Sequence, residues 1–152
     1  MSTFAGNPYF IDLETLIDKK LLTKEECESC DWGGSESYVD YEKMYLSRYK
    51  LLRKAYERAD LKNDPDYAVF LKKEKDWLLD YCLFMAIKNA QNGKCWIDWP
   101  EELKDRHSKA VKEAEKELAE EVGFYSFQQY CFTTQWNKLK EYANEKGIQI
   151  IG

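Results

Sequence analysis

The sequence predicts a mainly α-helical fold, and three observations support this prediction. Apolar residues recur at helical spacing over most of the 152 residues, and helix-capping residues precede several of these stretches. Only one run, Ile-Gln-Ile-Ile at 148–151, is typical of a buried strand. We therefore expect one helix-rich domain over residues 1–152 with a single stray strand at its C-terminal end.

Caps and breakers delimit the individual elements in chain order. Thr23 and Glu26 have the spacing of a capping box. Asp40 is placed to cap a long helix, and Pro65 suits the first position of another. Gly147 suits the position after a helix end. The predicted elements are a loop at 1–10 that includes a weak strand candidate at 9–11, a helix at 12–22, a helical turn from 23, a loop at 31–37, helices at 40–59 and 65–91, an aromatic loop at 95–100, a helix start at Pro100, a helix at 108–146 capped by Ser108, and the strand at 148–151.

The apolar pattern also predicts how two of these helices pack. Residues 77–87 are apolar nearly all round, which is typical of a central helix covered by others. The last helix carries a sustained stripe of apolar residues spaced by seven, which predicts a packing face. Gly123 lies inside that helix, costs about 1 kcal/mol there, and predicts a kink. The stripe consists of Val111, Leu118, Tyr125, Phe132 and Leu139.

Composition and charge exclude several classes of function. The formal net charge is −5 and the sequence pI is about 5.1, and no basic cluster is visible, so nucleic-acid and anionic-membrane binding are not expected. The most apolar window, 77–87, is too short to span a bilayer. The first residues lack the features of a signal peptide, so we expect a cytoplasmic protein.

Polar residues that could carry chemistry are isolated in the sequence. Cys27 and Cys30 have the spacing of half a zinc site, but a second ligand pair is missing, and a metal or thiol site stays a minor alternative. His107 has no evident catalytic partner and suits a surface or capping role. Asp80 interrupts the apolar helix, so we expect a buried acid that bonds a neighbouring turn or an arginine such as Arg48 or Arg53.

Aromatic residues make up 15% of the chain and allow two interpretations. Tyrosine and tryptophan are frequent core residues. Their flat rings also match the apolar face of a pyranose, so exposed ones are candidates for sugar binding. The candidates are Tyr41, Tyr45, Trp96 and Trp99.

Several segments, taken together, resemble a known family. In order and spacing they are similar to the N-terminal region of amylomaltases, the bacterial 4-α-glucanotransferases or disproportionating enzymes of the α-amylase clan. The resemblance spans essentially the whole chain. The segments are STFAGNPYFIDL at 2–13, VDY at 39–41, LDYCLFMAIK at 79–88, DWP at 98–100, FTTQW at 132–136, LK at 139–140 and GIQIIG at 147–152.

The resemblance implies both a fold context and a mechanism. In the family this region is a helical insertion between early strands of a (β/α)8 barrel, and a barrel strand begins at the position of 148–151. An aspartate attacks the anomeric carbon of an α-1,4-glucan, while a glutamate protonates the leaving oxygen and then activates the acceptor sugar. A third acid helps to bind the distorted sugar. All three acids lie downstream of this segment in family members.

The resemblance therefore assigns one binding residue and no catalytic residue. Tyr45 matches a family tyrosine that stacks on glucan at a secondary site away from the catalytic centre. The expected partner is an α-1,4-glucan or maltooligosaccharide, with no metal and no cofactor. The 152 residues alone are expected to be inactive, as part of a longer enzyme of maltodextrin and glycogen metabolism.

A second interpretation from a different class stays open. The long apolar stripe and the lack of a local active site are also typical of a stand-alone helical domain that binds another protein. Apolar surface on the last helix or at Ile148–Ile151 leaves homo-oligomerisation open as well.

Overall fold

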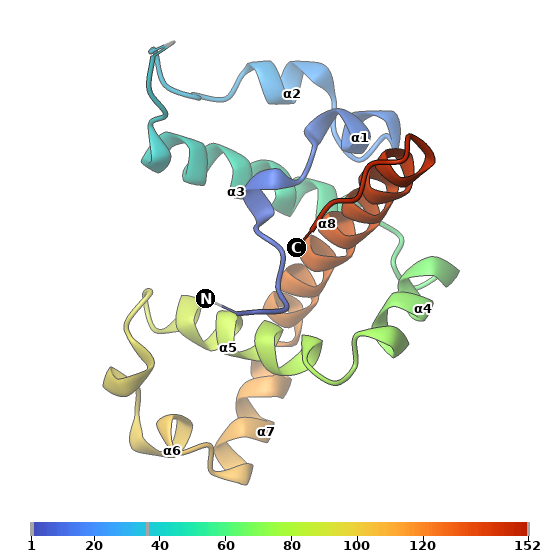
Figure 1. Cartoon of the computed structure of the whole chain (residues 1–152). Coiled ribbons are helices and arrows are strands. Elements are labelled where there is room, and N and C mark those ends of the chain that lie inside the picture. The colour runs from blue at the N-terminus through green and yellow to red at the C-terminus, as the bar shows by residue number, and fades with distance from the viewer. Residues whose placement is uncertain (1, 36, 152) are drawn as a thin grey trace. The chain divides into compact units, whose positions relative to one another are not determined.

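The computed structural model describes residues 2–35 and 37–151 (Figure 1). Every regular element within these residues is helical, which confirms the mainly α-helical prediction. The chain divides into two compact units. Unit 1 comprises the residues up to 6 together with 65–130, and unit 2 comprises 7–64 and the residues from 131 onward. Helix α8 (Ala119–Glu145) supplies its first part to unit 1 and its last part to unit 2.

Unit 2 is built on helices with capped N-termini, and the capping box predicted at Thr23 and Glu26 is formed. Asp12 accepts hydrogen bonds from the backbone of Glu14 and Thr15, and Thr23 and Glu26 form a reciprocal capping box. The core contains side chains that are almost fully buried, among them Ile11, Leu16, Leu51, Leu52 and Ala55. The elements are the 3-10 turn η1 (Pro8–Phe10), α1 (Leu13–Asp18), α2 (Lys24–Glu28), α3 (Tyr41–Arg58) and the last part of α8.

Unit 1 packs α5 against α7, and α6 against both α7 and the short turn η2. Its core has buried Leu83, Ile87, Trp99 and Ala114 at the centre, with partly buried Leu103, Val111, Leu118 and Val122 around them. The elements are α4 (Pro65–Lys73), α5 (Leu78–Ala90), η2 (Trp96–Asp98), α6 (Glu101–Lys104), α7 (Ser108–Glu117) and the first part of α8.

The single helix expected at 65–91 is in fact two helices. α4 ends at Lys73 and α5 begins at Leu78. Trp77 leaves the helical region, with φ −135° and ψ −30°, and its indole N–H donates to the carboxylate of Glu74 at 2.8 Å. A side-chain hydrogen bond across the break thus stabilises a turn that the apolar periodicity does not reveal.

The single helix expected at 108–146 is likewise divided, but at Leu118 rather than at Gly123. Leu118 has φ −102° and ψ 19°, whereas Gly123 lies inside α8. The amide of Leu118 still donates to Ala114, and its side chain packs against the core of unit 1. Core packing therefore decides where this helix bends. Ser108 is the first residue of α7 and His107 precedes it without a capping side-chain hydrogen bond, so the predicted Ser108 cap was wrong.

The C-terminal strand predicted at 148–151 is not formed among the described residues. Gly147 adopts φ 73°, as expected after a helix end, and the amide of Ile148 donates to the carbonyl of Ala143 at 2.9 Å. Beyond that point the described residues have no regular structure, because strand hydrogen bonds require a neighbouring strand and residues 2–35 and 37–151 offer none. The weak strand candidate at 9–11 also forms no strand, because its first two residues belong to η1 (Pro8–Phe10) and Ile11 follows that turn.

Two glutamines on α8 hold the N-terminal segment by paired hydrogen bonds. In unit 1, Gln129 accepts from the amide of Gly6 at 2.8 Å and donates to its carbonyl at 3.0 Å. In unit 2, Gln135 accepts from the amide of Asp12 at 2.7 Å and donates to its carbonyl at 3.1 Å. Each glutamine therefore satisfies both backbone groups of one residue that lies outside regular structure. None of the described helices is both long and apolar enough to cross a membrane.

Candidate functional site

The first turn of α3 is fixed by a set of hydrogen bonds from the loop that precedes it. The Asp40 side chain caps the helix by accepting from the amide of Lys43 at 3.1 Å. Lys43 also pairs with Asp31 at 2.8 Å, and the hydroxyl of Ser47 donates to the carbonyl of Asp31 at 2.7 Å. The hydrogen bond from Lys43 is the main cause that lowers the pKa of Asp31. Gly33, at φ 92°, brings the loop back towards Asp40.

Tyr45 directly follows this turn and is exposed to solvent. Its side chain is 44% exposed, and that of Tyr41, one turn earlier, is 66% exposed. The rings of Tyr45 and Tyr49 lie with centroids 4.4 Å apart and an angle of 35° between their planes. Tyr41, Tyr45 and Tyr49 are spaced by four residues, so they share one face of α3. Later turns of α3 are buried through Leu51, Leu52 and Ala55, so the tyrosines form an aromatic row on a helix that is anchored in the core of unit 2.

Two carboxylates in unit 2, those of Glu26 and Asp12, are engaged in structural hydrogen bonds. Glu26 accepts from both terminal nitrogens of Arg58 at 2.7 and 2.8 Å and from Lys54 at 3.0 Å. These contacts, led by Arg58, hold the pKa of Glu26 far below its usual value. At Asp12, burial acts to raise the pKa, but hydrogen bonds from Thr15 and the backbone outweigh burial and lower it. A general acid for glycoside chemistry needs a raised pKa, so neither group suits that role.

Asp80 differs from the sequence prediction. Its side chain is 70% exposed rather than buried, and it pairs with Nη2 of Arg106 at 2.8 Å rather than with Arg48 or Arg53. Arg48 instead donates to the backbone carbonyl of Ile11 at 2.6 Å. The contact between α5 and α7 brings the turn before α7 close to Asp80, so a residue 26 positions away supplies the partner.

The remaining candidates for chemistry are not brought together. Cys27 and Cys30 are free thiols, and burial followed by the neighbouring Cys30 raises the pKa of Cys27, which works against a reactive thiolate. The described residues contain no cluster of three or more metal-ligating side chains. His107 is exposed at the start of α7.

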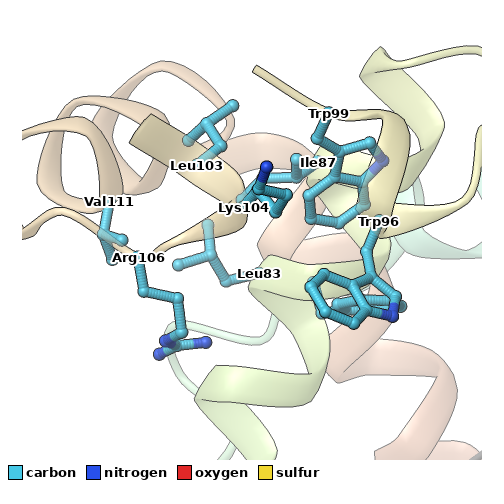
Figure 2. Close-up of a pocket in the computed structure, with 9 residues that line it drawn as sticks. Leu83, Ile87, Trp96, Trp99, Leu103, Lys104, Arg106 and Val111 are labelled. Carbon is cyan, nitrogen blue, oxygen red and sulfur yellow. The ribbon is translucent and has the colours of Figure 1, made fainter. Parts of the chain in front are cut away.

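Trp96 and Trp99, by contrast, line one hollow in unit 1 (Figure 2). The hollow has a volume of about 260 Å³. Trp99 is 7% exposed and belongs to the core, whereas Trp96 is 49% exposed. Figure 2 shows Trp96 and Arg106 on opposite sides of Leu83. The other lining residues are Phe84, Ile87, Leu103, Lys104 and Val111.

Sequence analysis did not predict which residues line the hollow together with Trp96. Phe84 and Arg106 lie 12 residues before and 10 residues after it, and only the packing of α5, α6, η2 and α7 places them around one hollow. The apolar stretch at 77–87 gave no signal for this hollow, since it predicted a covered helix, whereas Phe84 is 38% exposed.

Comparison with known proteins identifies the family. Residues 1–152 match glycoside hydrolase family 77, the 4-alpha-glucanotransferases. The chain is 43% identical over 151 residues to a 4-alpha-glucanotransferase of Clostridium butyricum and 41% identical over 155 residues to one of Thermus thermophilus. The chain thus belongs to the 4-alpha-glucanotransferase family, which confirms the resemblance seen in the sequence.

Solved structures agree with this assignment. An amylomaltase from Streptococcus agalactiae in complex with acarbose matches 98% of this chain with a TM-score of 0.90 and 33% sequence identity. The chain spans 30% of that amylomaltase, 31% of the Clostridium enzyme and 30% of the Thermus enzyme. The similarity therefore covers nearly all of this chain and less than a third of each relative.

Proposed function

We propose that this chain is the helix-rich segment of a cytoplasmic 4-α-glucanotransferase, an enzyme that transfers α-1,4-glucan chains between maltodextrins. The observation that carries the proposal is the family match over residues 1–152, at 43% identity to a named 4-alpha-glucanotransferase. The segment is inserted between early strands of a (β/α)8 barrel, and residues 148–151 become a barrel strand once neighbouring strands pair with them.

The transfer follows the retaining two-carboxylate scheme with an acceptor glucan in place of water. An aspartate forms the glycosyl-enzyme bond as a glutamate protonates the leaving oxygen, and the same glutamate then deprotonates the incoming hydroxyl. Neither acid is assigned to this chain. Glu26 accepts a hydrogen bond from Arg58, and Asp12 accepts one from Thr15, so both carboxylates have structural partners. This supports a segment that binds glucan and takes no part in bond cleavage. The 152 residues alone are therefore inactive.

Within the segment, Tyr45 is the residue that contacts glucan. Its exposed ring, its close neighbour Tyr49 and the capped helix beneath them support a platform for one pyranose face. Substitution of Tyr45 by Ala should weaken binding of maltoheptaose about fivefold, equivalent to about 1 kcal/mol for one lost aromatic contact. Tyr142→Ala is the matched control, because Tyr142 is 61% exposed on α8 and lies outside the aromatic row.

A segment exchange tests the proposed activity. The matching segment of the Clostridium butyricum enzyme is replaced by this chain, and glucose release from maltotriose is measured. We expect the chimera to transfer glucan within about tenfold of the unmodified enzyme, a change of about 1.4 kcal/mol, and the 152-residue chain alone to release no glucose. A chimera that melts cooperatively but transfers nothing would contradict the proposal and favour a helical domain with an unrelated partner.

A further inference from the structure

We propose that unit 1 carries a second contact for α-1,4-glucan, centred on the exposed indole of Trp96 and separate from Tyr45 in unit 2. The choice of ligand rests on the proposed function. The site itself rests on the surroundings of Trp96, where an exposed aromatic ring stands between two hollows of different character.

Trp96 is held in place before any ligand arrives. It opens the 3-10 turn η2, in which the amide of Asp98 donates to Cys95 at 2.9 Å and that of Trp99 donates to Trp96 at 3.2 Å. Trp99 anchors the turn because its ring is buried in the core and its indole N–H donates to the carbonyl of Lys94 at 3.2 Å. A ring carried by a backbone turn that is already fixed loses less conformational freedom on binding than one on a mobile loop.

The two hollows on either side of Trp96 share Phe84 as a second aromatic wall. The first hollow, of about 260 Å³, is lined mainly by apolar side chains of the core (Figure 2). The second, of about 620 Å³, is also lined by Asp76, Asp80 and Lys88. Trp96 therefore separates an apolar surface from a polar one.

A pyranose fits this arrangement because it has an apolar C–H face and a rim of hydroxyl groups. The ring of Trp96 can cover the face, while charged side chains at the rim exchange hydrogen bonds with hydroxyls. The pair formed by Arg106 and Asp80 engages one carboxylate oxygen, and both side chains are more than half exposed, so each keeps hydrogen-bonding capacity.

The charges around Trp96 favour a neutral ligand over an anion. Asp76 and Asp80 line the second hollow beside Lys88, and Arg106 is paired with Asp80. The two signs are mixed at the rim, so an anionic ligand gains little Coulomb attraction there. The hydroxyls of a polyol can pair with donors and acceptors of both signs, and a neutral ligand avoids the larger desolvation penalty of an ion.

The test is a titration of the full 152-residue chain with maltopentaose, followed through the indole N–H signals of its five tryptophans by ¹⁵N NMR. The Trp96 signal is assigned by its loss in Trp96→Phe. We expect that signal to move in a saturable way with maltopentaose and to stay unmoved with cellopentaose, whose β-1,4 links change the order of the sugar faces. In the variants, which lack the Trp96 signal, association is followed through the indole signal of Trp99, which lines the first hollow. It should weaken about fivefold in Trp96→Ala, and less in Trp96→Phe, which keeps an aromatic ring.

The matched control is Ile97→Ala, since Ile97 is 59% exposed in the same turn and lines neither hollow. A Trp96 signal that does not respond, or that responds equally to cellopentaose, overturns the inference. The Tyr45→Ala variant separates this outcome from failure of the proposed function. If Tyr45 still governs glucan binding and the segment exchange transfers glucan, the proposed function stands while the Trp96 site is rejected.

Discussion

Replacing Gln129 by leucine should destabilise unit 1 strongly. Gln129 is 1% exposed, and its amide satisfies both the N–H and the carbonyl of Gly6. Leucine has a similar size, so the change removes two hydrogen bonds without leaving a large cavity. Two net hydrogen bonds are worth about 1 kcal/mol each, and two backbone groups left partly buried and unpaired add to that, so we expect a loss of about 2–4 kcal/mol.

The matched substitution is Gln135→Leu. Gln135 makes the same pair of hydrogen bonds with Asp12, at 2.7 and 3.1 Å, but in a setting open to water. Water replaces the lost bonds there, so the expected loss is only about 0.5–1.5 kcal/mol. The comparison therefore isolates the effect of burial from that of the hydrogen bonds themselves.

Urea unfolding followed by circular dichroism measures the stability of both variants, and hydrogen exchange measures the amides of Gly6 and Asp12 directly. We expect the Gly6 amide to lose protection in Gln129→Leu and to keep it in Gln135→Leu. Equal losses of stability in the two variants, or a Gly6 amide that stays protected in Gln129→Leu, would refute the reasoning.

Two further predictions concern unit 2. The pKa of Glu26 is lowered on folding, so its contribution to stability is present above its ordinary value of 4.5 and is lost as the pH falls through the folded value. Glu26→Gln should therefore have a lower Tm than the parent at pH 7. Thermal melts that show the same difference in Tm at pH 3 would contradict this. Gly33→Ala should cost roughly 1–3 kcal/mol in urea unfolding, because φ is 92° and the new Cβ would lie 3.0 Å from that of Asp40. Gly34→Ala meets nothing within 4 Å and should cost less, and equal losses would count against strain at Gly33.

Local rules predicted the starts of helices better than their interruptions. Asp40 and the Thr23–Glu26 box were placed correctly because a cap acts on backbone groups within three residues of itself. The breaks at Trp77 and Leu118 escaped prediction, because the apolar spacing continues across both. The break at Trp77 depends on a side-chain hydrogen bond and that at Leu118 on core packing. Neither cause changes the spacing of apolar residues in the sequence.

The candidate site also has features that the sequence predicts and features that only the structure shows. The spacing of Tyr41, Tyr45 and Tyr49 predicts that they share one face of α3. The exposure of Tyr45 does not follow from that spacing, because buried Leu52 lies two turns further along the same face. The hollow beside Trp96 needs residues from four elements, so it becomes visible only in the structure. The binding role of Tyr45 stays a prediction, since it derives from the resemblance to amylomaltases.

The distribution of charged and aromatic groups indicates which part of the chemistry this segment can supply. Arg58 and Lys54 both donate hydrogen bonds to the carboxylate of Glu26. These two cations keep the carboxylate ionised, so it cannot deliver a proton near neutral pH. Exposed rings at Tyr45 and Trp96, by contrast, sit on elements that are fixed by caps and buried anchors. Fixed aromatic surfaces can hold a flexible glucan in place without taking part in bond cleavage. Under the proposed function, each of these aromatic contacts would add affinity for glucan, and the acids that cleave the bond would come from other parts of the enzyme.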